Sequence, residues 1–138
     1  MRRKAVGVYV VNDEGRLLLS QRGPSARHEP FKWESVGGEV EKGENFEQAA
    51  QREAREELGI HIEQINILSV HQKLFDSTVE EWEVKKFLAR TNDKPFLNEP
   101  DVSIGFGWFT IDETAKLELA SYAVGDLEIL RISLSMSK

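Results

Sequence analysis

The chain has 138 residues, 40% of them hydrophobic and 30% charged, a length and balance that predict one globular domain over residues 1–138. The absence of cysteine excludes disulfide bonds, thiolate metal sites and cysteine nucleophiles, and it is compatible with the reducing cytoplasm in which we expect the protein to act. The net charge of −6 argues against a nucleic-acid polymer as partner, and no apolar run approaches the roughly 20 residues of a membrane-spanning helix.

The N-terminal region is predicted to form a β-hairpin. Ala5–Val11 is a β-rich apolar run, Asn12–Gly15 has the composition of a turn, and Leu17–Gln21 is a second apolar run. Basic residues precede the first run, as they do in a signal peptide. We nevertheless interpret the run as a strand, because the sequence NDEG interrupts it directly and no small-residue cleavage site follows.

A loop and a short strand are expected next. The sequence RGPSARHEP contains glycine and two prolines, which break regular structure. Phe31–Val36 could form a short strand, and we expect Gly37 and Gly38 to end it.

The clearest helix pattern follows Asn45, a residue suited to the N-cap position. Phe46–Leu58 is rich in glutamine, alanine, arginine, glutamate and leucine, all of which are good helix formers. Gly59 is well placed to end the helix. The sequence therefore predicts a helix over Phe46–Leu58 with a cap at each end.

The second half of the chain alternates between strands, a loop and helices. Ile60–Leu74 and Glu81–Ala89 carry apolar residues at strand-like spacing, and Gly105–Thr110 is predicted to be a further short strand. The sequence TNDKPFLNEPDVS between them is predicted to be a polar loop. Asp112–Ala120 and Gly125–Ser133 have helical patterns. There is no internal repeat, low-complexity tract or linker.

The two faces of the Phe46–Leu58 helix separate at about 100° per residue. Polar residues gather on the side that we interpret as the solvent face: Gln48, Gln51, Arg52 and Arg55. Apolar residues take the other side: Phe46, Ala49, Ala50, Ala54 and Leu58. Glu53 and Glu57 fall within this apolar half and Glu56 lies at its edge, so these three glutamates are not ordinary surface charges.

Glu53, Glu56 and Glu57 have the spacing i, i+3, i+4, which brings their carboxylates together. Adjacent carboxylates repel one another, and partial burial adds to the cost, unless a cation lies among them or they are protonated. Hard divalent cations such as Mg²⁺ and Mn²⁺ prefer such oxygen ligands. The alternative is a solvated charged face with Arg52 and Glu56 as an ordinary i, i+4 pair, but other residues already occupy the solvent face. Glu47 borders that face and is interpreted as a surface charge.

A known family motif matches these residues. Gly38, five residues, Glu44, seven residues and then the sequence REAREELGI, which ends at Ile60, together resemble the complete Nudix box. The flanking hairpin, the later strands and the closing helix also look like a Nudix domain. The resemblance covers nearly the whole chain and implies an α/β fold, an α/β/α sandwich around a mixed β-sheet.

The resemblance implies metal-dependent hydrolysis of a nucleoside diphosphate linked to another moiety, by attack of water on a phosphorus of the pyrophosphate. The cofactor would be Mg²⁺ or Mn²⁺, and its ligands would be the backbone carbonyl of Gly38 and the carboxylates of Glu53, Glu56 and Glu57. Glu44 and Arg52 would complete the catalytic machinery by bracing the loop and helix, Arg52 by pairing with a carboxylate. Charge supports a metal independently, because an acidic chain could scarcely hold a pyrophosphate unless metal ions bridged carboxylates and phosphates.

Two features depart from the usual family pattern. Val36 stands before the paired glycines where many members have proline, and its effect on the loop is not determined by the sequence. The stretch LLLSQRGPSARHEPFKWESVGGEVEKGE is also similar to the isopentenyl diphosphate isomerase branch. That branch relies on a cysteine, and this chain has none.

Residues outside the box are candidates to select the substrate. Arg22 and Arg27, in the loop ahead of the box, could contact phosphate or ribose. Glu99 and Asp101 precede a late strand, where Nudix enzymes often supply a further acidic ligand or general base. Six aromatic residues could stack on a nucleobase, although core packing is the commoner role: Phe31, Trp33, Phe75, Trp82, Phe106 and Trp108.

The sequence therefore predicts a Nudix pyrophosphohydrolase whose partner is a small-molecule nucleotide, such as a nucleoside triphosphate. The alternative is a Nudix-like module that binds a nucleotide or protein without hydrolysing it. The complete set of mutually repelling glutamates argues against that alternative, because binding alone does not require them. The sequence leaves open the nucleotide, the general base and whether the protein forms a homo-oligomer.

Overall fold

The structure is a computed structural model that describes residues 2–75 and 80–136. Its strands are β1 (Arg2–Val11), β2 (Leu17–Arg22), β3 (Trp33–Glu34), β4 (Val36–Glu39), β5 (Glu63–Phe75), β6 (Glu80–Arg90) and β7 (Ser103–Phe109). Its helices are α1 (Phe46–Leu58), α2 (Ile111–Thr114), α3 (Ser121–Val124) and α4 (Asp126–Met136). Within the described residues, none of these helices has the length and apolar character needed to cross a membrane.

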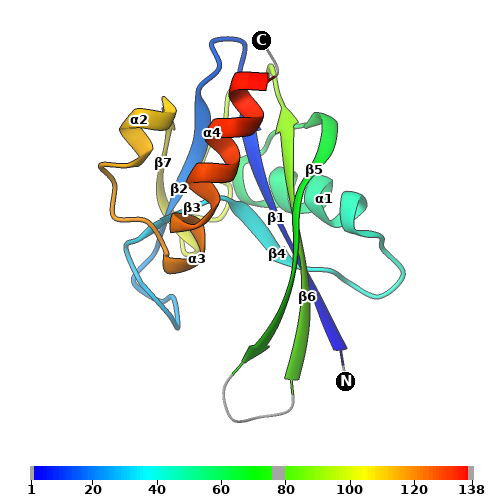
Figure 1. Cartoon of the computed structure of the whole chain (residues 1–138). Helices are drawn as coiled ribbons and strands as arrows, with labels where there is room; N and C mark the ends of the chain where they lie inside the picture. The colour runs from blue at the N-terminus through cyan, green and yellow to red at the C-terminus, as the bar shows by residue number, and fades with distance from the viewer. Residues whose placement is uncertain (1, 76–79, 137–138) are drawn as a thin grey trace.

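All seven strands belong to one mixed sheet with β1 at its centre (Figure 1). β1 pairs in parallel with β6 from Arg2 to Val11, and β6 pairs antiparallel with β5. The other edge of β1 is shared by two strands: its last residues pair with β2, whereas Ala5–Val8 pair with β4. β2 also pairs with β3 and β7. The sheet therefore divides beside β1.

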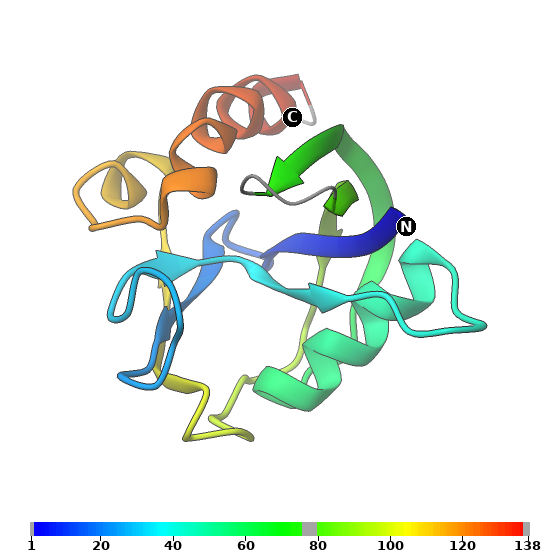
Figure 2. The same cartoon turned by 90° about the horizontal axis from the view of Figure 1, so that it is seen from below.

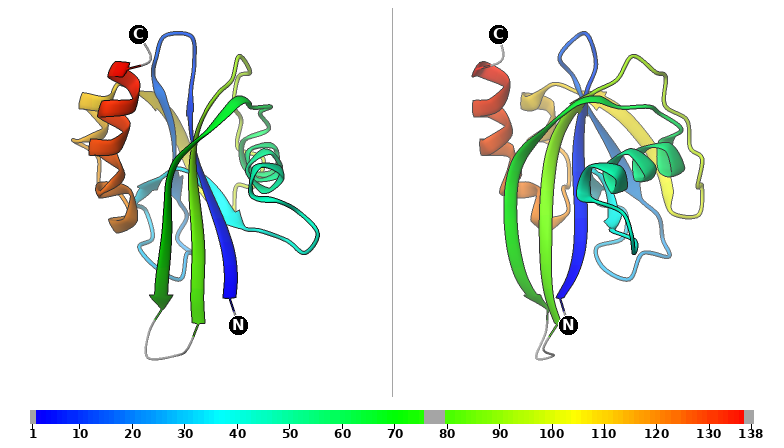
Figure 3. Two further views of the ribbon diagram at one scale, coloured as in Figure 1. Left: turned by 45° about the vertical axis from the view of Figure 1, so that its right-hand side comes forward. Right: turned by 90° about the vertical axis from the view of Figure 1, so that its right-hand side faces the viewer.

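Helices cover both faces of the sheet. Figures 2 and 3 show α1 on one side of the strands and α2, α3 and α4 on the other. The core under α1 contains Val8, Val36 and Leu58, and the core under α4 contains Tyr9, Leu19 and Leu130, all buried. This arrangement confirms the predicted α/β/α sandwich around a mixed sheet.

The hairpin and the long strands form as the sequence predicts, but two local expectations are wrong. Gly37 and Gly38 lie inside β4 and do not end a strand. Asp112–Ala120 is not one helix, because α2 ends at Thr114 and the chain then runs alongside β3, where Trp33 donates to Glu118 and accepts from Ala120. Backbone pairing with Trp33 thus replaces the helix. Phe75 ends β5, and its side chain lies outside the described part of the structure.

Both caps of α1 form as predicted. The Asn45 side chain accepts from the Gln48 backbone N–H, and the Gln48 side chain accepts from the Asn45 N–H, which makes a capping box. At the other end Gly59 adopts a left-handed φ of 65°, and its N–H donates to helix carbonyls.

The loop between β6 and β7 is attached to the C-terminal end of α1. The Phe96 N–H donates to the Leu58 carbonyl at 3.0 Å. Asn98 donates twice, from its backbone N–H to Glu57 O at 3.1 Å and from Nδ2 to Glu56 O at 2.9 Å. These bonds satisfy carbonyls that a helix end otherwise leaves without partners, and they fix the loop that carries Glu99.

Gly59→Ala should destabilise the protein more than Gly15→Ala. Both glycines have left-handed backbones, with φ of 65° and 75°, so each alanine costs about 1 to 2 kcal/mol of conformational energy. A Cβ at Gly59 would also overlap the Phe96 ring, whereas a Cβ at Gly15 meets no atom within 4 Å. We expect Gly59→Ala to lower the free energy of unfolding by roughly 1 kcal/mol more than Gly15→Ala does. Chemical denaturation measures both values, and equal losses would contradict the packing of Phe96 on Gly59.

Candidate active site

The three central glutamates of α1 differ in exposure. Glu57 is buried, with 8% of its surface accessible, Glu53 is largely covered, and the Glu56 side chain is 46% exposed. Glu47 is exposed, as predicted for a surface charge. The helix wheel therefore places Glu53 and Glu57 correctly inside the apolar half of α1.

Gly38 of β4 leaves room for this helix face to approach the sheet. A Cβ on Gly38 would lie 2.5 Å from Oε1 of Glu53, so the carboxylate occupies space that any other residue would fill. The backbone N–H of Gly37 lies near the Glu57 carboxylate and acts to lower its pKa. β4 thus supplies room for one glutamate and a backbone dipole for another.

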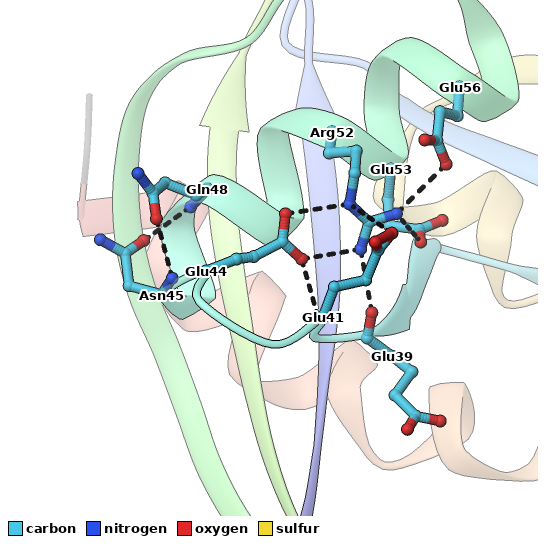
Figure 4. Close-up of polar contacts among 8 residues, drawn as sticks. All are labelled: Glu39, Glu41, Glu44, Asn45, Gln48, Arg52, Glu53 and Glu56. Atoms are coloured by element: carbon cyan, nitrogen blue, oxygen red, sulfur yellow. Dashed lines mark hydrogen bonds and ion pairs between the residues drawn. The ribbon is translucent and has the colours of Figure 1, made fainter.

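Arg52 joins the box loop to the helix (Figure 4). Its Nε and Nη2 donate to the two carboxylate oxygens of Glu44 at 2.9 and 2.8 Å. Its Nη1 donates to Glu53 at 2.7 Å and to Glu56 at 3.1 Å, and Nη2 also donates to the Glu39 carbonyl at 2.9 Å. The Arg52 side chain is only 14% exposed. Its assignment to the solvent face was therefore wrong, because the folded loop covers it.

Glu44 accepts three hydrogen bonds within the box. In addition to its two bonds from Arg52, its Oε1 accepts from the Glu41 backbone N–H at 2.9 Å. The hydrogen bonds from Arg52 lower the pKa of Glu44 below its ordinary value, with a smaller contribution from Glu41. Glu44 is thus held as an anion beside the guanidinium.

The electrostatic environment of Glu57 is the opposite of that of Glu44. Burial raises the pKa of Glu57 well above its ordinary value, and the nearby carboxylates of Glu53 and Glu34 raise it further. The described residues provide no ion pair for it, and the Gly37 backbone N–H opposes these shifts. Burial also raises the pKa of Glu53, although Arg52 opposes the shift. Arg52 is therefore the one cation paired with the glutamates of α1 among the described residues, and Glu57 has no share in that pairing.

The donor set suits a hard divalent cation. Arg52 bonds to Oε1 of Glu53 and Oε2 of Glu56, and the other oxygen of each carboxylate has no hydrogen bond from residues 3–70 and 81–135, whose side chains are described. As they stand, no three acidic or histidine side chains of these residues converge on one point. The available ligands are nevertheless all oxygens, and a divalent cation would supply the positive partner that Glu57 does not find among the described residues.

A pocket of about 400 Å³ opens beside Glu57 and the two glycines of β4. Its wall is mostly apolar and includes Ala5, Val84 and Val102, with Trp82 and Tyr122 as its aromatic members. Arg22, Glu34 and Lys86 are its other charged residues. The pocket joins the glutamate cluster to a region with aromatic surface.

The predicted substrate residues fall in different places. Arg22 lines the pocket, but its Nη1 is paired with Glu34 at 2.8 Å and its Nε donates to the His28 carbonyl. Arg27 is exposed in its loop and does not line the pocket. Glu99 lies close enough to Glu53 and Glu57 to raise the pKa of both.

The structure does not bring Trp33 into the pocket. Trp33 packs in the core under α4, edge to face with Phe109 at a centroid distance of 5.3 Å. Of the aromatic candidates, Trp82 lines the pocket, and the Arg3 guanidinium lies 4.5 Å from the centroid of its ring. The sequence pattern could not separate these two tryptophans, because each lies in a strand.

Three pocket residues were not singled out from the sequence: Glu34, Lys86 and Tyr122. Lys86 is buried, donates to Asp126 at the start of α4 at 2.6 Å, and donates to the Tyr122 carbonyl at 3.3 Å. Asp126 also accepts from the Tyr9 hydroxyl, and burial and Asp126 raise the pKa of Tyr9. A lysine between Val84 and Leu88 on one face of a strand was the available signal, since those neighbours are apolar. Nothing comparable distinguished Glu34 or Tyr122.

Comparison with known proteins gives a consistent result. The NUDIX domain family matches residues 1–130. A Nudix hydrolase of Deinococcus radiodurans is 33% identical over 134 residues, 94% of this chain and 77% of that protein. A CTP pyrophosphohydrolase of Escherichia coli is 37% identical over 73 residues, 53% of each chain. The crystal structure of a MutT NUDIX hydrolase from Burkholderia pseudomallei has a TM-score of 0.79 at 32% identity and covers 93% of this chain and 97% of that chain.

The raised pKa of Glu57 predicts a pH dependence of stability in metal-free protein. Because the folded state holds this proton more tightly than the unfolded chain, its stabilisation is complete below the ordinary pKa of 4.5 and is lost as pH rises through the raised pKa. Glu57→Gln removes this loss while keeping the shape of the side chain. The variant should therefore melt at a higher temperature than wild type at pH 7, and the difference should shrink toward pH 4.5.

Thermal melts in a chelator between pH 4.5 and 8 would test this, with Glu47→Gln as the exposed carboxylate control. A Glu57→Gln curve parallel to the wild-type curve would show that Glu57 ionises without penalty in the fold.

Proposed function

The chain belongs to the NUDIX family of hydrolases, and on this premise we propose that it cleaves the pyrophosphate linkage of a nucleoside triphosphate or a related nucleotide, with Mg²⁺ or Mn²⁺. We take residues 1–138 as a single catalytic domain. The observation that carries the proposal is the buried Glu57 carboxylate without an ion pair among the described residues, beside a pocket with aromatic walls.

The proposed metal site consists of the carboxylates of Glu53, Glu56 and Glu57 with the carbonyl of Gly38. These residues would hold a divalent cation, which would offset negative charge at the site and lower the pKa of a water molecule. Arg52 holds one oxygen of Glu53 and one of Glu56, which restricts how far either side chain can turn. Glu44 in turn holds Arg52 through two hydrogen bonds. The chain thus orients the carboxylates before any substrate binds.

Glu99 is the candidate for an acidic group from outside the box. Its carboxylate influences both Glu53 and Glu57, and Asn98 fixes the preceding backbone to the end of α1. Asp101 is exposed, and its carbonyl accepts from the Ser25 hydroxyl. We therefore place Glu99, and not Asp101, beside the reacting phosphates.

The pocket is proposed to hold the part of the substrate that is not phosphate. The positively charged residues of the pocket are already paired, Arg22 with Glu34 and Lys86 with Asp126. The pocket therefore offers little net positive charge to attract a phosphate group. Trp82 and Tyr122 add aromatic surface to apolar walls, which suits the planar face of a nucleobase. The name of the E. coli relative, a CTP pyrophosphohydrolase, agrees with a nucleotide substrate.

Glu56→Gln and Glu57→Gln should each abolish most of the activity without unfolding the protein. Each change removes a negative charge from the proposed metal site but keeps the shape of the side chain. We expect kcat to fall by about 100-fold or more, the scale of losing one electrostatic contact at a reacting centre. Release of phosphate or pyrophosphate from a panel of nucleotides with Mg²⁺ or Mn²⁺ measures this loss.

Thermal stabilisation by the metal alone provides a second readout. A cation at about 100 times its dissociation constant stabilises a folded protein that binds it by about 2.7 kcal/mol. Wild type and the Glu47→Gln control should show this gain, and Glu56→Gln and Glu57→Gln should lose most of it. Full turnover together with full metal stabilisation in both variants would exclude these glutamates as the metal site. Wild-type protein that hydrolyses no nucleotide in the panel would count against the proposed activity.

A further inference from the structure

Glu34 is a pocket carboxylate held by one of its two oxygens. It lies in β3, and its side chain is 15% exposed. Its Oε1 accepts from Arg22 Nη1 at 2.8 Å and from the Tyr122 hydroxyl at 2.6 Å. The two donors come from different elements, Arg22 from β2 and Tyr122 from α3. Oε1 is therefore fixed in place by two separate elements of the fold.

The second oxygen of Glu34 has no such partner. No donor among residues 3–70 and 81–135, whose side chains the structure describes, hydrogen-bonds to Oε2, and Oε2 is not among the buried polar atoms without a partner. Glu34 lines the pocket, where Ala5, Val84 and Val102 offer no side-chain donor. An acceptor in such a wall gains from a ligand that donates a hydrogen bond to it and is penalised by a ligand that presents another acceptor.

We propose that Glu34 is a specificity-determining residue, whose Oε2 accepts a hydrogen bond from an exocyclic amino group of the nucleobase. This inference rests on the proposed function, in which the pocket holds the base. An amino group donates to Oε2, whereas a keto oxygen at the same ring position would face it acceptor to acceptor. The enzyme therefore selects amino-bearing bases over their keto counterparts, cytosine over uracil and adenine over hypoxanthine. A site built around a hydrogen bond rejects the analogue that lacks it more strongly than apolar fit alone does.

Glu34→Gln offers a sharp test because the fold dictates which way the amide turns. Arg22 can only donate, so the amide oxygen must take the place of Oε1. The amide NH₂ then takes the place of Oε2. The substitution therefore changes the group facing the pocket from an acceptor to a donor, with almost no change in shape. The same variant should favour keto-bearing bases.

The experiment measures kcat/KM for the pairs CTP and UTP, and ATP and ITP, in wild type, Glu34→Gln and the exposed control Glu47→Gln. For the pair that wild type cleaves faster, we expect the amino member to be favoured by at least about tenfold. Glu34→Gln should reverse that preference, and Glu47→Gln should leave it unchanged. A purely structural role for Glu34 would lower kcat/KM for both members equally and would lower the melting temperature, so an unchanged ratio overturns the proposal.

The wild-type protein provides a test that does not depend on folding of the variant. Removing the amino group from the better substrate, as in the 2-pyrimidinone analogue of CTP or the purine analogue of ATP, should reduce kcat/KM by at least about tenfold. Equal cleavage of the substrate and its analogue, or a wild-type preference for the keto members, overturns the role of Glu34 but leaves the hydrolase proposal standing. A wild-type protein that cleaves none of these nucleotides contradicts the proposed function instead.

Discussion

The site depends on one guanidinium placed among carboxylates. Arg52 makes five hydrogen bonds, two to Glu44, one each to Glu53 and Glu56, and one to the Glu39 carbonyl. A guanidinium has five N–H donors in a rigid plane, so a single residue can join the loop to the helix with every donor used. A lysine has three donors and could not replace it. Arg52 does not reach Glu57, so among the described residues this carboxylate has no cationic partner. A divalent cation is proposed to bind there.

The division of the sheet beside β1 determines where the carboxylates of Glu53 and Glu57 lie. β4 takes over from β2 along the edge of β1, and its Gly38 carries no side chain toward α1. Glu53 fills the space next to Gly38, and the Gly37 N–H acts to lower the pKa of Glu57. On the other side of the sheet, the buried pair of Lys86 and Asp126 holds the start of α4 near the pocket. Separating such a pair leaves an uncompensated charge in the interior, which costs free energy. The pair therefore holds the pocket wall in place mainly through this cost and less through net attraction.

Local patterns determined how much of this could be predicted. The caps of α1, the inward position of Glu53 and Glu57 and the strands of the hairpin follow from periodicity and residue type within short windows. The parallel pairing of β1 with β6 joins residues about 80 positions apart, and nothing local encodes it. Arg52 was misplaced because its partners lie in the preceding loop. The sequence could not decide between core and pocket for Trp33, because its neighbours, Phe109 and the chain near Leu119, come from far along the sequence. Side chains whose environment is built by distant segments were the ones that the sequence could not resolve.

One short segment joins the two ends of the proposed substrate site. Glu34 ends β3 and Gly37 lies in β4, with the buried residues Ser35 and Val36 between them. Glu34 faces the proposed base end of the pocket, whereas Gly37 lies near Glu57 at the proposed phosphate end. Because β3 is paired to β2 and β4 to β1, this segment cannot stretch without breaking the sheet. The backbone therefore sets the separation between base recognition and the carboxylates, and a substrate must match it to reach both.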